Sequence, residues 1–297
     1  MQNNDSILLF ETYRPVLMGI AYRFLSTVSD AEDVVQDVYL KWSNEDIDTI
    51  QNPEAWLKTV CTRNCLDIVK SVERKRIDYV GTWLPEPIQT ETSAEDDYLN
   101  QAHLADSLST AFIVMLERLT PKERAAYLLY EIFDTPYRTV AEALNLEEQT
   151  CRKLVSRAKS HIEKNKKRAL VSPEKQAAFV NAFEFAITSG DSSNLQDLLA
   201  NDIVLRADGG GKVAAILKPI EGSLEVLNFL VNDLKQFWHT FTWLKSKING
   251  NDGFIIKSSD HIHAIVSFEF NEQDQASEIF IMRNPDKMAA LKTMPIN

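Results

Sequence analysis

The sequence predicts a multi-domain protein in which two all-α domains precede a C-terminal α+β domain. Three observations lead to this prediction. The length, 297 residues, is more than one domain usually requires. Apolar residues recur with helical spacing from the N-terminus to about residue 170. After Ser172-Pro173, several short segments alternate apolar and polar residues, which is the period of β-strands.

The domain boundaries follow from these changes in pattern. We expect all-α domains at 1–78 and 103–170, and an α+β domain at 171–297. Residues 79–102 are the expected linker, because YVGTWLPEP contains two prolines and QTETSAEDD is acidic and poor in apolar residues.

The first domain begins with two expected helices, over 5–26 and from Ser29 to about Trp42. Ser29 is the expected N-cap of the second helix, with Glu32 completing a capping box. Asp30, Asp33 and Asp37 fall on the outer face of this helix. This acidic stripe is either a solvated surface or a docking face for a basic partner.

The third expected helix starts at Asn52-Pro53, a cap followed by proline at the first helical position, and ends near Arg76. One side is apolar, whereas the other presents Arg63, Lys70 and Arg74. The helix is either an ordinary amphipathic helix or one that contacts nucleic acid through its aromatic and basic residues.

Residues 137–159 predict a helix-turn-helix. Val140, Ala141 and Leu144 form the apolar side of a short helix, and Asn145 suits the left-handed backbone of the turn. The second helix presents polar and basic side chains, as a DNA-recognition helix does. The alternative is a helical hairpin with a solvated basic face.

Charge is distributed unevenly along the chain. The net charge is −11, yet residues 111–170 contain 12 basic and 8 acidic side chains and are net positive. The positive charge therefore coincides with the helix-turn-helix, where a polyanion would bind.

Other features narrow the class of protein. No run of 18 apolar residues predicts a membrane span, and the N-terminus has no signal-peptide pattern. Cys61, Cys65 and Cys151 are few and lie on apolar helix faces, so we expect reduced thiols, no metal, no cofactor and a cytoplasmic location.

The last domain should contain helices at 173–189 and about 224–237, and strands that include KVAAIL at 212–217. We expect a curved antiparallel sheet, with a pocket between the sheet and the helices.

The order of these motifs resembles a bacterial RNA polymerase sigma factor of the extracytoplasmic-function (ECF) type. DAEDVVQDVYLKW is similar to the region 2 helix that docks on the polymerase clamp. NPEAWLKTVCTRNCLDIVKSVERKR is similar to the helix that melts and reads the −10 element. The segment from LERLTPKERAAY to LVSRAK is similar to region 4, which reads the −35 element.

The resemblance implies that core RNA polymerase, through the clamp of its largest subunit and its flap region, and promoter DNA are the partners. The implied polymerase-binding residues are Asp30, Glu32, Asp33, Gln36 and Asp37. The implied DNA-binding residues are Lys58, Arg63, Asn64, Lys70, Arg74, Arg138, Gln149, Thr150, Arg152, Lys153 and Arg157. Two positions differ from common region 4 patterns, with Asn145 in place of Gly and Glu147 in place of Ser.

Three further motifs resemble one subgroup, in which a SnoaL-like domain of the nuclear-transport-factor-two (NTF2) fold follows the sigma regions. They are WLPEP at 83–87, DGGGK at 208–212 and NPDKM at 284–288, where the subgroup usually has Leu in place of Met288. The resemblance implies that this domain replaces a separate anti-sigma factor and regulates in cis. The implied interdomain residues are Trp83, Leu84, Pro85, Glu86, Pro87, Asp208, Gly209, Gly210, Gly211, Lys212, Asn284, Pro285, Asp286 and Lys287.

Other interpretations remain open at this point. The C-terminal domain could bind a small molecule, or be an isomerase- or cyclase-like enzyme with Asp208, His261 or His263 as its base. A simple DNA-binding repressor would leave residues 29–76 without a role. DGGGK could be only a hairpin turn.

Overall fold

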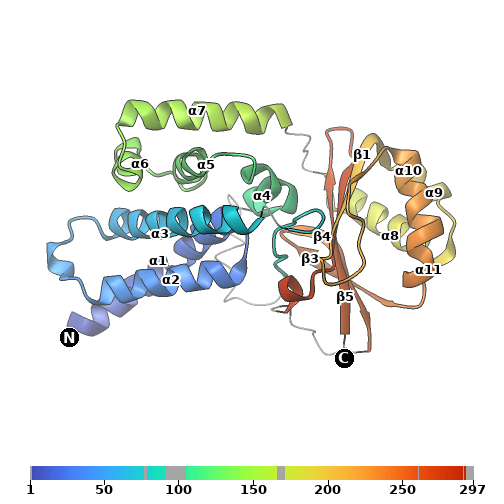
Figure 1. Ribbon diagram of the computed structural model, residues 1–297, viewed down its shortest axis with the longest axis horizontal. Coiled ribbons are helices and arrows are strands. Elements are labelled where there is room, and N and C mark those ends of the chain that lie inside the picture. The colour runs from blue at the N-terminus through green and yellow to red at the C-terminus, as the bar shows by residue number, and fades with distance from the viewer. Residues whose placement is uncertain are drawn as a thin grey trace. The chain divides into compact units, whose positions relative to one another are not determined.

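A computed structural model describes residues 2–76, 79–90, 105–165, 171–259, 261–289 and 291. The chain divides into two compact units (Figure 1). Unit 1 comprises Met1–Asp78, Ser93–Leu108 and Phe112–Asn165, and unit 2 comprises Tyr79–Thr92, Ser109–Ala111 and Lys166–Asn297. Among the described residues, no helix is long and apolar enough to cross a membrane.

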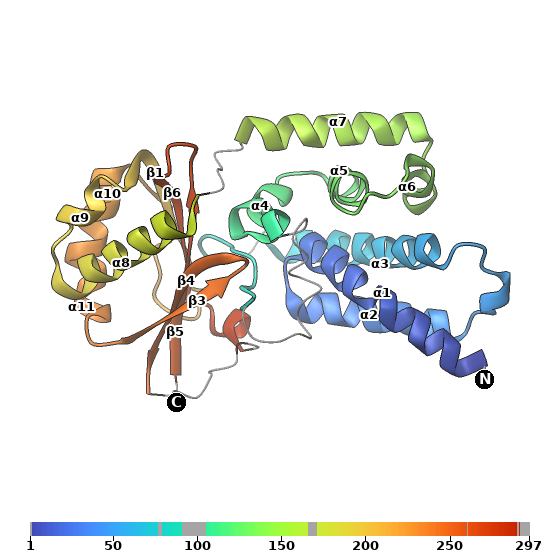
Figure 2. The ribbon, with the colours of Figure 1, turned by 180° about the vertical axis from the view of Figure 1, so that it is seen from behind.

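Unit 1 is built from helices. They are α1 (Gln2–Leu25), α2 (Val28–Ser43), α3 (Pro53–Arg76), α4 (Thr110–Leu116, of which the first two residues belong to unit 2), α5 (Pro121–Tyr127), α6 (Tyr137–Leu144) and α7 (Glu148–Asn165). Single turns of 3-10 helix lie at Ile47–Thr49 and Ala105–Leu108, and a π-helical turn at Leu128–Ile132 continues α5. Helices α1, α2 and α3 lie side by side in both views (Figures 1 and 2), around buried residues such as Leu17, Val38 and Trp42.

Of the two N-caps expected in unit 1, the structure confirms Asn52 and contradicts Ser29. The Asn52 side chain accepts from Ala55 N at 3.0 Å, and Thr120 forms a complete capping box with Glu123. The expected Ser29 cap is wrong, because α2 starts at Val28 and Ser29 lies inside its first turn. Thr27 is the N-cap residue, and its hydroxyl donates to the Asp30 carboxylate at 2.5 Å.

The helix-turn-helix consists of α6 and α7. Asn145 between them has φ 52° and ψ 54°, the left-handed conformation expected from the sequence. Cys151, Val155 and Ala158 of α7 are buried, which leaves the polar side of the helix exposed.

Unit 2 contains a six-stranded sheet in the order β2-β1-β6-β5-β4-β3. The strands are β1 (Leu199–Asp208), β2 (Ile220–Glu221), β3 (Thr242–Ile248), β4 (Asn251–Ser258), β5 (His261–Phe270) and β6 (Ala276–Met282). The helices are α8 (Pro173–Ser189), α9 (Ser193–Gln196), α10 (Ser223–Asn228) and α11 (Lys235–Trp238), with a π-helical turn at Phe229–Leu234.

Two expectations for this sheet are wrong. The sheet is mixed rather than antiparallel, because β1 pairs in parallel with β6. The segment KVAAIL forms no strand, since residues 209–213 fold into a tight loop stabilised by Gly209 O accepting from Lys212 N and Val213 N.

Helices α8 to α11 lie on one side of the sheet in both views (Figures 1 and 2). Aromatic side chains of Phe179, Phe183, Trp243, Phe254 and Phe268 contact one another between these helices and the sheet. These side chains form an aromatic core between the helices and the sheet, in which Phe183, Phe254 and Phe268 are fully buried.

Candidate DNA-reading surface and linker site

The recognition helix α7 exposes the polar residues expected from the sequence. Gln149, Thr150, Lys153 and Arg157 are exposed. The Arg152 side chain is 58% exposed and lies 3.5 Å from the Glu148 carboxylate. On α6, Arg138 pairs with Glu142 at 3.2 Å and keeps 85% of its side chain exposed. The polar side of the helix-turn-helix in unit 1 is therefore accessible to a polyanion.

Helix α2 exposes the expected acidic face. Glu32, Asp33, Gln36 and Asp37 are exposed, whereas Asp30 is half-buried and bonded to Thr27. Inward residues Ala31, Val34, Val35 and Val38 fix the orientation of the helix, so the acidic side chains point away from the core.

The expected DNA-binding residues of α3 are engaged inside unit 1. Arg63 donates to the carbonyls of Glu142 and Ala143 at 2.6 and 3.1 Å, at the C-terminal end of α6. Lys58 is buried, donates to Phe133 O at 3.2 Å and pairs with Glu54 at 2.7 Å. Both side chains are therefore bonded to the segment that runs from Phe133 to the end of α6.

Asn64, Lys70 and Arg74 are the other expected DNA-binding residues of α3. Asn64 accepts from Lys41 at 2.6 Å, and its amide nitrogen is buried without a hydrogen-bond partner. Lys70 and Arg74 lie on α3, but their side chains fall outside the described part of the structure.

Asp208, at the end of β1, is the centre of a buried polar site in unit 2. Its carboxylate accepts from Tyr79 Oη at 2.6 Å, Leu84 N at 2.9 Å, Gly210 N at 2.9 Å and Lys287 Nζ at 2.8 Å. The WLPEP, DGGGK and NPDKM motifs, far apart in the sequence, therefore meet at one carboxylate.

Lys287 joins the same site from the other side. Its ammonium donates to Leu84 O at 2.6 Å and lies 4.2 Å from the Trp83 ring and 5.0 Å from the Tyr79 ring. Burial, followed by the hydrogen bond to Asp208, raises the pKa of Tyr79, so its hydroxyl stays protonated and donates at neutral pH.

The other motif residues complete this site. Asn284 Nδ2 donates to Tyr79 Oη at 3.0 Å, and Lys212 pairs with Asp286. Gly210 has φ 61°, and a Cβ at that position would lie 2.4 Å from Asn284 Nδ2. Leu84, Pro85, Glu86 and Pro87 are buried, whereas Pro285 is exposed.

A second contact holds the linker to the sheet, and the sequence analysis missed it. Ile88 N donates to Asn249 Oδ1 at 2.9 Å, and Asn249 N donates to Ile88 O at 2.8 Å. Thr90 N donates to Lys247 O at 3.0 Å, so residues 88–90 extend the edge of β3. Backbone pairing of this kind has no residue signature, although Asn249-Gly250 was readable as a turn.

The three candidate catalytic bases do not share a site. The Asp208 carboxylate already accepts hydrogen bonds from the four donors described above. His263 accepts from or donates to Ser258 Oγ at 2.6 Å, stacks on Phe241 at 4.3 Å and lies 4.7 Å from His261. Burial lowers the pKa of His263, with smaller effects from His261 and Arg283.

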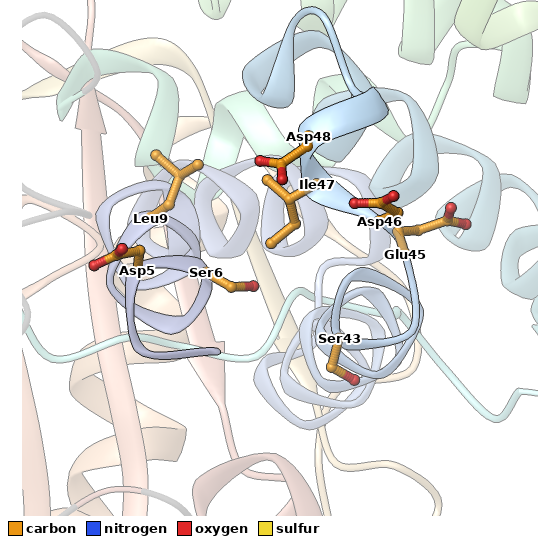
Figure 3. Close-up of a pocket in the computed structure, with 8 residues that line it drawn as sticks. All are labelled: Asp5, Ser6, Leu9, Ser43, Glu45, Asp46, Ile47 and Asp48. Carbon is orange, nitrogen blue, oxygen red and sulfur yellow. The ribbon is translucent and has the colours of Figure 1, made fainter. Parts of the chain in front are cut away.

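A hollow of about 410 Å³ lies in unit 1, beside the ends of α1 and α2 (Figure 3). It is lined by Asp5, Ser6, Leu9, Ser43, Glu45, Asp46, Ile47 and Asp48. None of the expected site residues lines it, and its four carboxylates make it unsuitable for DNA phosphates.

The helical fold of unit 1, with its helix-turn-helix and its acidic helix α2, is that of a transcription initiation factor with several regions. Comparisons with known proteins lead to the same class. Residues 9–75 match the family model of Sigma-70 region 2, and residues 109–162 match that of Sigma-70, region 4. The ECF RNA polymerase sigma factor SigJ of Mycobacterium tuberculosis is 36% identical over 231 residues, 77% of this chain and 73% of SigJ. Probable ECF sigma factor SigI of the same species is 30% identical over 202 residues, 67% of this chain and 69% of SigI.

The crystal structure of SigJ is similar to this one over nearly all of this chain and the whole of SigJ. The TM-score is 0.76 at 30% identity, and the match covers 96% of this chain and 100% of SigJ. The likeness therefore includes the C-terminal α+β unit. This chain belongs to the ECF RNA polymerase sigma factors, in the subgroup with a C-terminal SnoaL-like domain, and directs transcription initiation at specific promoters.

Proposed function

We propose that the SnoaL-like domain regulates this sigma factor in cis, by binding the linker between regions 2 and 4. The observation that supports this most strongly is the Asp208–Lys287 pair, which binds the linker backbone at Leu84 from two sides. On this proposal, residues 1–78 and 103–170 are the sigma regions, 79–102 the linker and 171–297 the regulatory domain, which makes a separate anti-sigma factor unnecessary.

In the proposed mechanism, the exposed face of α2 binds the polymerase clamp. Glu32, Asp33 and Asp37 are exposed and free of buried partners, so a basic surface can reach all three. Region 4 then places α7 in the major groove of the upstream element, where Gln149, Thr150 and Arg152 meet base edges and Lys153 and Arg157 meet phosphates.

Region 2 contacts the melted strand through α3. Because Lys58 and Arg63 are bonded to region 4, α3 has to separate from Phe133 and the end of α6 before these side chains reach DNA. This requirement would keep the free protein from engaging both promoter elements, which suits a factor that works only within the polymerase, in the cytoplasm.

We propose no catalytic role for the SnoaL-like domain. The Asp208 carboxylate accepts four hydrogen bonds, which leaves it unsuited to act as a base. His263 has a lowered pKa, but it contacts Ser258 and Phe241 rather than a cavity next to Asp208.

The test of polymerase docking is a charge reversal with a matched control. Substitution of Lys for Glu32, Asp33 and Asp37 should abolish binding of core RNA polymerase, because all three charges become repulsive. The control carries Lys at Glu45, Asp46 and Asp48, the same change of charge at the acidic hollow, and should bind core normally. Equal core affinity of the two variants in a pull-down titration would rule out this docking face.

A further inference from the structure

Two tyrosines of unit 1 and the recognition helix form a stack. The Tyr130 and Tyr137 rings lie 3.9 Å apart at an interplanar angle of 23°, and the Arg152 guanidinium lies 4.2 Å from the Tyr137 ring. One face of a ring cannot accept two neighbours at such distances, so Tyr137 is sandwiched between Tyr130 and Arg152. The stack joins three elements that are separate in the sequence.

Each partner in this stack is held by its own element. Tyr130 lies in the π-helical turn Leu128–Ile132, whose extra residue per turn changes the direction of its side chains relative to α5. Tyr137 is the first residue of α6, and Arg152 lies in the second turn of α7. Lys159 pairs with Glu131 at 3.3 Å and ties the π-helical turn to α7 a second time.

The stack restricts a side chain that would otherwise be mobile. Arginine has many rotamers, and an exposed one loses much conformational freedom when it binds a base edge. The Tyr137 ring limits where the Arg152 guanidinium can lie, and the Glu148 carboxylate at 3.5 Å contacts one of its terminal nitrogens. A planar, oriented guanidinium is what bidentate recognition of guanine requires.

The pKa of Tyr137 supports this role. Burial raises it first, followed by Tyr130, and Arg152 opposes the shift only in part. The phenol therefore stays neutral at pH 7 and places no negative charge beside the DNA backbone.

We propose that Tyr137 is a positioning residue for promoter recognition, which orients Arg152 to read one base pair of the upstream element. This inference rests on the proposed DNA-reading role of α7. It adds that base preference depends on a residue outside the recognition helix, through the electrostatic attraction between the Tyr137 ring and the guanidinium.

The experiment uses the full chain with core RNA polymerase on a promoter pool randomised in its upstream element, with transcripts counted by sequencing. Arg152→Ala should reduce the preference at one base pair about five- to hundredfold, as expected for a lost bidentate contact. Tyr137→Leu should reduce the preference at the same base pair about two- to fivefold, and combining it with Arg152→Ala should add nothing further.

Conservative variants separate positioning from a structural role. Tyr137→Phe keeps the ring and should retain the preference. Phenylalanines with one, two and three ring fluorines at position 137 preserve the shape but weaken the negative ring face stepwise, so the preference should fall stepwise. This series also covers the case in which Tyr137→Leu does not fold.

Arg157→Ala is the matched control on the same helix, outside the stack. It should weaken binding to all promoters alike. It should also reduce the slope of log affinity against log salt concentration by about one. If Arg152→Ala leaves every base preference unchanged, the base-reading role of Arg152 fails and the inference fails with it. If Arg152→Ala changes one preference but the fluorinated series leaves it constant, only the positioning role of Tyr137 is overturned.

Discussion

At the scale of single residues, the chemistry of unit 2 depends on one carboxylate. Asp208 has no exposed surface, and a charge in that position is stable only when each of its oxygens is hydrogen-bonded. Two of its four donors, Tyr79 Oη and Leu84 N, belong to the linker. The linker is therefore held in place by the requirement to satisfy a buried charge, rather than by apolar contact alone.

This requirement predicts how substitutions of the pair behave. Asp208→Asn and Lys287→Met should each lower the free energy of unfolding by about 3–5 kcal/mol, because each leaves one uncompensated buried charge. The double variant should lose clearly less than the sum, because it buries no unpaired charge. Urea denaturation of the four proteins measures these values, and strictly additive losses would contradict a coupled pair.

At the scale of elements, the glycine loop after β1 shows why this motif needs glycine. Gly210 and Gly211 have φ values of 61° and 70°, which other residues adopt only with strain. A Cβ on Gly210 would lie 2.4 Å from Asn284, which is bonded to Tyr79, whereas a Cβ on Gly211 would meet the linker residue Val80 at 3.2 Å, where the exposed side chain has room to shift.

The two glycines therefore offer a matched comparison. Gly211→Ala should destabilise by about 1–2 kcal/mol through backbone strain. Gly210→Ala should cost more, about 2–4 kcal/mol, because Asn284 is held by Tyr79 and Asp286 and cannot move away without loss of its bonds. Limited proteolysis should detect earlier cleavage between residues 79 and 90 only in Gly210→Ala. Equal stability and equal cleavage of the two variants would contradict a role of the glycine loop in holding the linker.

Local features of the elements could be predicted from the sequence, whereas contacts between distant segments could not. Thr120, Asn52 and Asn145 act locally, through bonds or backbone conformations within a few residues, and their roles were predictable. The parallel β1–β6 pairing and the Ile88–Asn249 bonds join residues distant in the sequence, and backbone groups leave no residue signature. The engagement of Arg63 with α6 was missed for the same reason, since its acceptors are carbonyls.

At the scale of the whole molecule, the linker connects two kinds of contact with the promoter. It leaves region 2 after α3 and enters region 4 before α4, while residues 79–90 belong to unit 2. Twelve residues of extended chain span up to about 40 Å, so holding them removes a large part of the reach between the two DNA-reading regions. The SnoaL-like domain would then restrict which promoter spacings the factor accepts.

Promoter spacing is therefore the measurement that tests the regulatory claim most directly. Transcription by core polymerase with the full chain is measured on promoters whose two elements are separated by up to two base pairs more or less than the optimum. One base pair shifts an element by about 3.4 Å and rotates it by about 34°. The native chain should lose transcription about tenfold per base pair of misfit, a difference of about 1.4 kcal/mol. The double variant Asp208→Asn with Lys287→Met, which lacks the charged pair that holds the linker at Leu84, should lose only about twofold. An identical spacing profile of the two proteins, with protease cleavage showing that the linker of the variant is free, would contradict regulation through the linker.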